Sequence, residues 1–339
     1  MSENKIMKNH QISKLGFTSE QQYTFPTIVN LCVIRGDCPC RCVHCPVGLT
    51  QPSERHKRFG NTDLSLDLFD KIIQEMSAFH HSTLRIHGVG EPLLWGKLHE
   101  ALQFASEHKV RTWLFTCLIH HDNNLLREIA ANCDIIEVSI NSYDAENYLQ
   151  TKGIDGFKTV KMNLEFVRDF VVKNNLSTRI IGSRVESEHC DYDDEFLTYW
   201  KNTNLLDDVF IRSYHDYNSL LKSNRQRGIS DIIPCLVHWN RFNIDCDGTA
   251  VLCFNELFKA NHSDSQVVLG NVTENTIRDI WVCEKLNIVR EAQMKKDYSS
   301  VAFADALPCI GCLSCQPIGQ NARPTSELQI NAFKSVNKR

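Results

Sequence analysis

Four cysteines lie within eight consecutive residues near the N-terminus, in the segment Cys38-Pro39-Cys40-Arg41-Cys42-Val43-His44-Cys45. Cys38, Cys42 and Cys45 have the spacing C-x3-C-x2-C, whereas Cys40 falls outside that register. Three soft thiolates on one short loop suit an iron–sulfur cluster, and a four-iron cluster held by three cysteines keeps one iron open to another molecule. Structural zinc is the alternative, but such sites usually need four protein ligands and this triple supplies three.

A second group of cysteines lies in the C-terminal part of the chain. Cys309, Cys312 and Cys315 form two overlapping C-x2-C steps, while Cys235 precedes and Cys253 follows a predicted hairpin. Two separate halves that meet in the fold would make a four-thiolate metal site. The spacing leaves open whether this site holds zinc or an iron–sulfur cluster, because four cysteines suit both.

Alternating strand and helix patterns must position these cysteines. β-Rich apolar segments predict strands, and apolar residues at helical spacing predict helices. Strands are expected at residues 27–34, 83–87, 110–115, 135–140, 178–185 and 208–212, and helices at 65–79, 95–108, 122–131, 156–174 and around 195–200. Six such alternations predict βαβ units in an α/β fold with a parallel sheet, where functional groups gather at the carboxyl ends of the strands.

The pattern changes after about residue 222. A polar linker is expected at 222–228, and Asp247-Gly248 between two apolar segments predicts a hairpin. Apolar residues at helical spacing predict one helix over 275–295. The chain is therefore divided into a lead-in at 1–26, a main domain at 27–222, a cysteine-rich domain at 223–320 and a polar tail at 321–339.

Composition excludes several classes of protein. The chain has 339 residues, 42% hydrophobic and 23% charged, with a net charge of −4, so it has no basic footprint for nucleic acid. No apolar run approaches the ~18 residues that a membrane span needs, and the N-terminus has no apolar signal segment. Fifteen cysteines without an export signal argue against a disulfide scaffold and predict a cytoplasmic metalloprotein.

The C-x3-C-x2-C motif directly after the first strand resembles the signature of the radical S-adenosylmethionine (SAM) enzymes. Gly88-Val89-Gly90-Glu91-Pro92, one strand later, resembles the Gly-Gly-Glu-Pro turn of that family, although Val89 departs from it. The C-terminal cysteines, with Leu269-Gly270-Asn271-Val272 between them, resemble the SPASM/twitch extension of the same enzymes. The resemblance covers residues from about 27 to 316. It implies a partial (β/α)6 TIM-like barrel followed by a small auxiliary-cluster domain.

The resemblance also implies cofactors and the residues that hold them. Cys38, Cys42 and Cys45 would bind a [4Fe–4S] cluster whose open iron takes SAM. The implied SAM contacts are Gly88, Gly90, Glu91, Thr116, Ser139, Asn141 and Arg184. The implied ligands of one auxiliary [4Fe–4S] cluster are Cys235, Cys253, Cys309 and Cys312, with Cys315 as the rival of Cys312. Six further cysteines, Cys32, Cys40, Cys133, Cys190, Cys246 and Cys283, are expected to be packed thiols.

The implied reaction is reductive cleavage of SAM to a 5′-deoxyadenosyl radical, which abstracts hydrogen from a substrate. The electron would come from a flavodoxin- or ferredoxin-type donor. Tyr214 and His215 resemble a substrate-side segment of relatives that act on small polar molecules. Residues 1–26 are too few to build a peptide-recognition core. We therefore expect a sugar, aminosugar or aminocyclitol substrate and a dehydrogenation or epimerisation.

Two alternatives remain open at this stage. The first is modification of a ribosomal peptide with a separate recognition protein. The second is a non-enzymatic iron–sulfur or zinc protein.

Overall fold

The computed structural model describes residues 12, 14–17, 19–186, 190–217, 220–221, 234–309 and 312. The side chain of Cys190 is not among the parts described. The predictions made for the linker at 222–228, the tail at 321–339 and Cys315 lie outside the described residues.

A mixed sheet of nine strands forms the centre of the molecule, in the order β6-β5-β4-β3-β2-β1-β7-β8-β9. The strands from β6 to β7 in this order pair in parallel, and β7-β8-β9 is antiparallel. Their bounds are β1 (Ile28–Arg35), β2 (Thr83–Val89), β3 (Arg111–Thr116), β4 (Ile135–Ser139), β5 (Arg179–Val185), β6 (Asp208–Arg212), β7 (Arg241–Ile244), β8 (Thr249–Val251) and β9 (Val268–Asn271). Because β6 and β9 remain edges, the sheet does not close, which confirms the prediction of a partial barrel.

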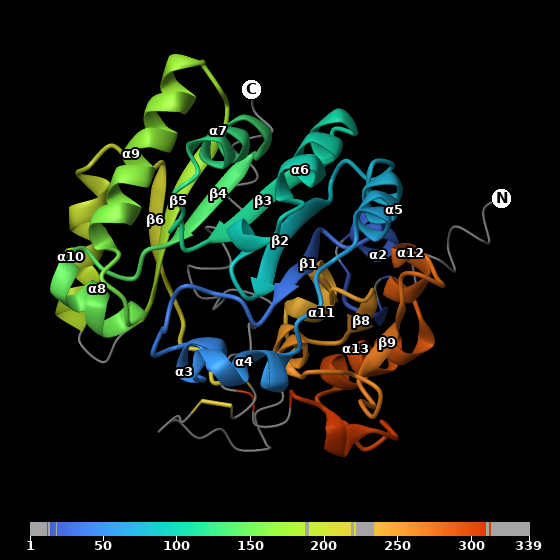
Figure 1. The fold of residues 1–339 in the computed structure, drawn as a ribbon. Helices are drawn as coiled ribbons and strands as arrows, with labels where there is room; N and C mark the ends of the chain where they lie inside the picture. The colour runs from blue at the N-terminus through green and yellow to red at the C-terminus, as the bar shows by residue number, and fades with distance from the viewer. Residues whose placement is uncertain are drawn as a thin grey trace.

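Helices cover the sheet and its carboxyl ends. In Figure 1, α5, α6, α7 and α9 lie along one face, while α3 and α4 lie near the arrowheads of β1 and β2. The helices are α2 (Glu20–Thr24), α3 (Pro46–Leu49), α4 (Pro52–Phe59), α5 (Leu66–Met76), α6 (Leu98–Glu107), α7 (Asn123–Asn132), α8 (Ala145–Lys152), α9 (Phe157–Lys173), α10 (Cys190–Lys201), α11 (Val237–Asn240), α12 (Ile277–Trp281) and α13 (Glu284–Lys295), with 3-10 turns at Pro92–Leu94, Phe254–Phe258 and Ala304–Ala306.

Local sequence explains why these elements form. All eight residues of β1 are buried, as expected for a parallel strand covered on both faces. Ser65 begins α5 because its hydroxyl accepts a hydrogen bond from the Leu68 N–H (3.2 Å). The apolar stripe of that helix is buried as its spacing predicts, through Leu68, Phe69, Ile72, Ile73 and Met76.

The single helix predicted at 275–295 is wrong, because the chain breaks between α12 and α13. Cys283 has extended backbone dihedral angles and caps α13. The buried side chain of Arg290 turns back across the break and donates to the Trp281 carbonyl (2.8 Å). This bond satisfies a carbonyl that a continuous helix would have bonded internally.

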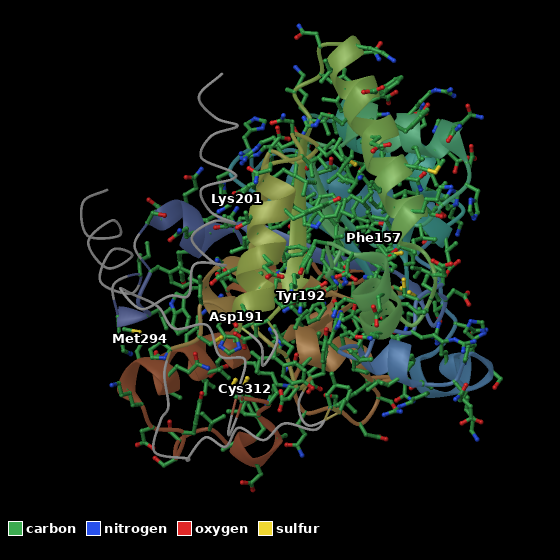
Figure 2. All side chains as sticks on the ribbon, turned by 90° about the vertical axis from the view of Figure 1, so that its left-hand side faces the viewer. Phe157, Asp191, Tyr192, Lys201, Met294 and Cys312 are labelled. Atoms are coloured by element: carbon green, nitrogen blue, oxygen red, sulfur yellow. The ribbon has the colours of Figure 1, made fainter. Side chains whose placement is uncertain are left out.

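The C-terminal hairpin joins the main sheet. Strand β7 pairs in parallel with β1, with Leu31 opposite Ile244. The Asp247-Gly248 turn is confirmed, since β7 and β8 are antiparallel neighbours and Gly248 has φ of +85°. In Figure 2, Cys312 lies beyond the Asp191 end of α10, away from Lys201. The hairpin therefore brings the C-terminal cysteines to the edge where the barrel strands end.

Candidate active site

Backbone contacts on two sides hold the N-terminal cysteine loop. The Arg41 N–H donates to the Lys152 carbonyl at the end of α8 (2.7 Å). From α4, the buried Arg55 guanidinium donates to the carbonyls of Cys38 (2.6 Å) and Cys40 (2.8 Å). The loop is thus fixed to two helices.

Five thiols line the cavity at this loop, those of Cys38, Cys40, Cys42, Cys45 and Cys117. Cys40 is buried, as expected, but it belongs to the cavity wall. Hydrogen bonds with Cys117, Cys38 and Cys42 lower the pKa of the Cys40 thiol. The sulfurs therefore lie close together, and a group of soft donors fits an iron–sulfur cluster.

Lys152 places a cation beside these thiols. Its side chain is buried, and Nζ donates to the carbonyl of Ser139 (2.6 Å) and to its hydroxyl (2.8 Å). Burial alone would lower the pKa of Lys152, but the negative charges of the neighbouring sulfurs, Cys42 first, hold it well above its usual value. An ammonium group so placed offsets the negative charge of a thiolate-bound cluster.

The turn Gly88-Val89-Gly90-Glu91-Pro92 packs directly on the cysteine loop. The Glu91 N–H donates to the Asp37 carbonyl (2.7 Å). A Cβ atom on Gly90 would stand 2.6 Å from that carbonyl oxygen, and one on Gly88 would stand 2.8 Å from the Ile34 side chain. Both glycines are therefore needed for the close approach of two loops.

Three donors fix the Glu91 carboxylate inside the cavity wall. Thr116 Oγ1 donates to Oε1 (2.5 Å), the Cys117 N–H donates to Oε2 (2.8 Å) and the Leu93 N–H donates to Oε1 (3.2 Å). Burial raises the pKa of Glu91, and these hydrogen bonds oppose the rise. Thr116 does not line the cavity itself and instead positions Glu91.

Ser139 and Asn141, at the end of β4, both line the cavity. Asn141 has φ of +63°, and its side-chain carbonyl accepts from the Val185 N–H (2.8 Å). Arg184 lies outside the lining, because its guanidinium pairs with Asp193 (2.7 Å) and donates to the Asn141 carbonyl. Arg184 thus supports the loop that carries Asn141.

The C-terminal cysteines Cys235, Cys253, Cys309 and Cys312 line the same cavity from its other side. Burial, followed by the charges of Cys312 and Cys235, raises the pKa of Cys253. Sulfurs that raise one another's pKa in this way are stabilised as thiolates when they bind a metal. The four cysteines therefore fit an auxiliary cluster.

Gln293 connects three parts of this second group. Its Oε1 accepts from the Cys235 N–H (3.0 Å), which identifies that atom as the oxygen. The same atom lies 3.1 Å from His238 Nδ1, and Nε2 donates to Cys309 Sγ (3.6 Å). Gln293 is fully buried in α13.

The cavity between the two cysteine groups has a volume of about 250 Å³. His215 lines it and is half-buried, whereas Tyr214 lies outside the lining. Sequence reasoning missed further polar residues of its lining, which are Asn30, Arg85, His87, Arg212, Arg241 and Asn255. The available signal was a polar side chain at an inward position of an otherwise apolar strand, as at Asn30 in β1 and Arg85 in β2.

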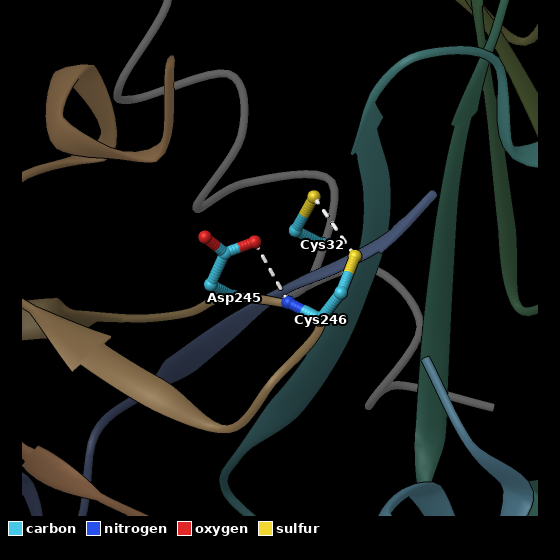
Figure 3. A group of neighbouring side chains, drawn as sticks. All are labelled: Cys32, Asp245 and Cys246. Carbon is cyan, nitrogen blue, oxygen red and sulfur yellow. Dashed lines mark hydrogen bonds between the residues drawn. The ribbon is translucent and has the colours of Figure 1, made fainter. Parts of the chain in front are cut away.

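A further thiol pair lies outside the cavity lining. Cys32 and Cys246 are buried with sulfurs 3.6 Å apart, and Asp245 lies beside them (Figure 3). The Asp245 carboxylate is bonded to Arg35 (2.5 Å) and His262 (2.6 Å). Burial would raise the pKa of Asp245, but these two partners hold it below its usual value. The group links β1 to the C-terminal hairpin as a buried ion pair.

Two models of known protein families match the chain. A model described as the radical SAM superfamily matches residues 33–196, and one described as an iron–sulfur cluster-binding domain, SPASM, matches residues 235–313. The chain belongs to the radical SAM superfamily. The radical SAM domain implies a [4Fe–4S] cluster and SAM as cofactors, and the SPASM domain implies auxiliary iron–sulfur clusters. No curated protein matches the sequence.

Several solved structures share this radical SAM fold at low sequence identity. SuiB of Streptococcus suis, bound to the precursor peptide SuiA, is 12% identical with a TM-score of 0.61, over 84% of this chain and 70% of that one. The enzyme anSMEcpe with bound AdoMet is 14% identical with a TM-score of 0.58, over 92% and 100%. BtrN with AdoMet and 2-DOIA is 15% identical with a TM-score of 0.52, over 87% and 96%.

Within the part of the chain that the structure describes, no helix is both long enough and apolar enough to cross a bilayer.

Proposed function

We propose that this radical SAM enzyme acts on a small polar substrate, such as a sugar, aminosugar or aminocyclitol, and dehydrogenates or epimerises it. When cluster and SAM are bound, the chemistry they supply is reductive cleavage of SAM and abstraction of a hydrogen atom from the substrate. A flavodoxin- or ferredoxin-type protein would supply the electron.

One observation carries this proposal: the two cysteine groups line a single cavity with polar side chains between them. Cys38, Cys42 and Cys45 would hold the first cluster, and Cys235, Cys253, Cys309 and Cys312 an auxiliary one. A substrate bound in the middle would then lie within reach of both. An auxiliary cluster in that place could accept the electron that a net oxidation releases.

The chain's own residues orient the reactants. The Glu91 carboxylate, fixed by Thr116 and Cys117, would accept hydrogen bonds from the amino group of SAM. Ser139 and Asn141 would meet its ribose, and the backbone of Gly88 and Gly90 allows close approach. His215, whose Nδ1 atom is buried and has no protein partner among the described residues, would face the substrate.

A second candidate is modification of a peptide. SuiB was solved with the precursor peptide SuiA and anSMEcpe with the Cp18Cys peptide, whereas BtrN was solved with 2-DOIA. The same fold therefore accommodates peptide and small-molecule ligands. We favour the small molecule because the unpartnered donors and acceptors lie buried in the cavity wall, where a compact polar ligand would reach them.

Cysteine variants of the anaerobically reconstituted protein test the proposal. Wild type should hold about four irons at each of two clusters and form 5′-deoxyadenosine with dithionite. Cys42→Ala should form none, because the cluster that binds SAM is lost. Cys253→Ala should keep SAM cleavage but lose substrate turnover, because only the auxiliary cluster is affected.

Cys133→Ala is the matched control, since Cys133 is a buried thiol packed in the main core away from the cavity. It should retain both activities. Normal SAM cleavage by Cys42→Ala, or a wild-type protein that binds zinc in place of iron, would contradict the proposal.

A further inference from the structure

Cations dominate the cavity wall. Arg85, Lys152, Arg212 and Arg241 line it, while among the described lining residues Glu91 is the one carboxylate. Glu91 already accepts three protein hydrogen bonds, from Thr116, Cys117 and Leu93. Apart from the cysteine sulfurs, the cavity wall therefore carries more cationic than anionic side chains.

Two of these cations belong to the cofactor ends of the cavity. Lys152 lies among the sulfurs of the N-terminal loop, where Cys42 and Cys40 raise its pKa. At the other end, burial and then the charge of Arg212 lower the pKa of Arg241 to about 10, and the charges of Cys235 and Cys253 act in the opposite direction. Clusters bound there would offset these two charges.

Arg85 and Arg212 remain for the middle of the cavity, and they share one carboxylate. Glu137, fully buried in β4, accepts a hydrogen bond from Arg212 Nε through Oε1 (2.8 Å), and its Oε2 lies 3.5 Å from Arg85 Nη2. Both guanidiniums also lie over the ring of Phe115, at 5.1 and 5.4 Å, which itself lines the cavity. Two cations on one carboxylate leave an excess charge of +1 at this place.

The positive charges lower the pKa values of two neighbouring histidines. Burial and then the charges of Arg212 and Arg241 lower the pKa of His215 to about 4, and burial and then Arg85 lower that of His87 to about 3. Neither imidazole adds a charge at neutral pH, so both can give or accept neutral hydrogen bonds.

Unsatisfied polar atoms surround the same place. His87 is 2% exposed and Asn30 is 1% exposed, and both line the cavity. Both ring nitrogens of His87, Asn30 Oδ1 and Arg85 Nε are buried with no protein partner among the described residues. Buried polar groups are normally hydrogen-bonded, so a ligand that supplies the missing partners is indicated.

We propose that Arg85 and Arg212 form an anion subsite, and that the substrate carries a carboxylate or phosphate group which binds there. Hydroxyl groups of the same molecule would bind His87 and Asn30. This inference rests on the proposed function and narrows it, from a polar small molecule to an anionic one. Guanidinium groups suit both kinds of anion because their planar N–H groups match carboxylate and phosphate oxygens.

Calorimetry on the reconstituted, SAM-loaded enzyme tests the subsite. The probes are glucuronate for the carboxylate, glucose 6-phosphate for the phosphate and glucose as the neutral member. At least one anionic probe should bind about tenfold or more tightly than glucose, because hydrogen bonds to a charged group are stronger than those to a neutral one. The stronger of the two anions identifies the group.

Variants locate the binding. Arg212→Gln should lower the affinity for the anionic probe by about tenfold or more, and Arg212→Lys should restore part of it. Arg85→Gln should act in the same direction. Arg168→Gln is the control, because Arg168 pairs with Asp207 and does not line the cavity; its affinity should equal that of wild type.

Equal binding of glucose and both anions by wild type, or anion binding unchanged in Arg212→Gln and Arg85→Gln, would overturn the inference. The iron content of each variant checks its integrity. Dithionite-driven SAM cleavage without substrate reports on the proposed function separately: loss of anion preference with intact SAM cleavage defeats only the subsite, and absent SAM cleavage in wild type defeats the proposed function.

Discussion

At the scale of single residues, N–H groups and cations lie close to the cysteine sulfurs on both sides of the cavity. Burial raises the pKa of Cys45, and the N–H groups of Gly48 and Val47 oppose the rise. Gln293 donates to Cys309 at the opposite end. Each contact stabilises negative charge on sulfur in a place with little water. Such contacts are among the means by which proteins set cluster potentials.

Gln293→Leu should therefore make the reduction potential of the auxiliary cluster more negative. The change removes the N–H···S bond to Cys309 and the acceptor of the Cys235 N–H. A redox titration followed by EPR measures both clusters, and the N-terminal cluster provides the internal control because Gln293 does not contact it. An auxiliary potential equal to that of wild type would show that this hydrogen bond has no electrostatic role.

The sequence predicted some of the residues that line the cavity and missed others. The ligand cysteines could be proposed because three thiols at fixed spacing are rare without a metal. Lys152 and Arg85 could not, because a lysine at the end of a helix and an arginine in a strand usually face water. Their function depends on which sulfurs and which carboxylate lie opposite. Such partners are distant in sequence, since Arg85 and Glu137 are 52 residues apart.

At the scale of elements, the turn after β2 and the loop after β1 behave as one unit. The N–H of Gly36 donates to the Val89 carbonyl (2.8 Å), and the N–H of Glu91 donates to the Asp37 carbonyl (2.7 Å). These bonds tie the position of the Glu91 carboxylate to that of Cys38. A displacement of either loop would move both proposed cofactor contacts.

Gly90→Ala should accordingly lower both stability and cluster occupancy. Its Cβ would overlap the Asp37 carbonyl, and overpacking of this kind costs about 1–3 kcal/mol. Thermal unfolding and iron analysis after reconstitution measure the two effects. Gly96→Ala is the matched control, since a Cβ there meets no atom within 4 Å. If both variants unfold and load iron alike, the two loops are not coupled in this way.

Most elements of the main domain were predictable, because apolar periodicity there is unbroken. All six predicted strands occur within two residues of their expected ends, as with residues 208–212 and β6. The break between α12 and α13 was not predictable, because no proline or glycine marks it. It depends on the side chain of Arg290, which reaches the Trp281 carbonyl from within the following helix.

At the scale of the whole molecule, one sheet carries both cysteine groups. The sequence predicted a separate C-terminal domain after a linker, and a hairpin within it. It could not predict that β7 would lie beside β1, since strand order is set by long-range packing. Asn30 of β1 bonds Asn243 of β7 (2.9 Å), and Arg35 pairs with Asp245. This pairing brings the C-terminal cysteines to the cavity that the barrel strands open.

The central claim is that the N-terminal loop alone holds the cluster that binds SAM. EPR of the dithionite-reduced protein in which Cys235, Cys253, Cys309 and Cys312 are all alanine tests it most directly. We predict one reduced cluster signal that changes when SAM is added. A protein without a cluster signal, or a signal that SAM leaves unchanged, would contradict it.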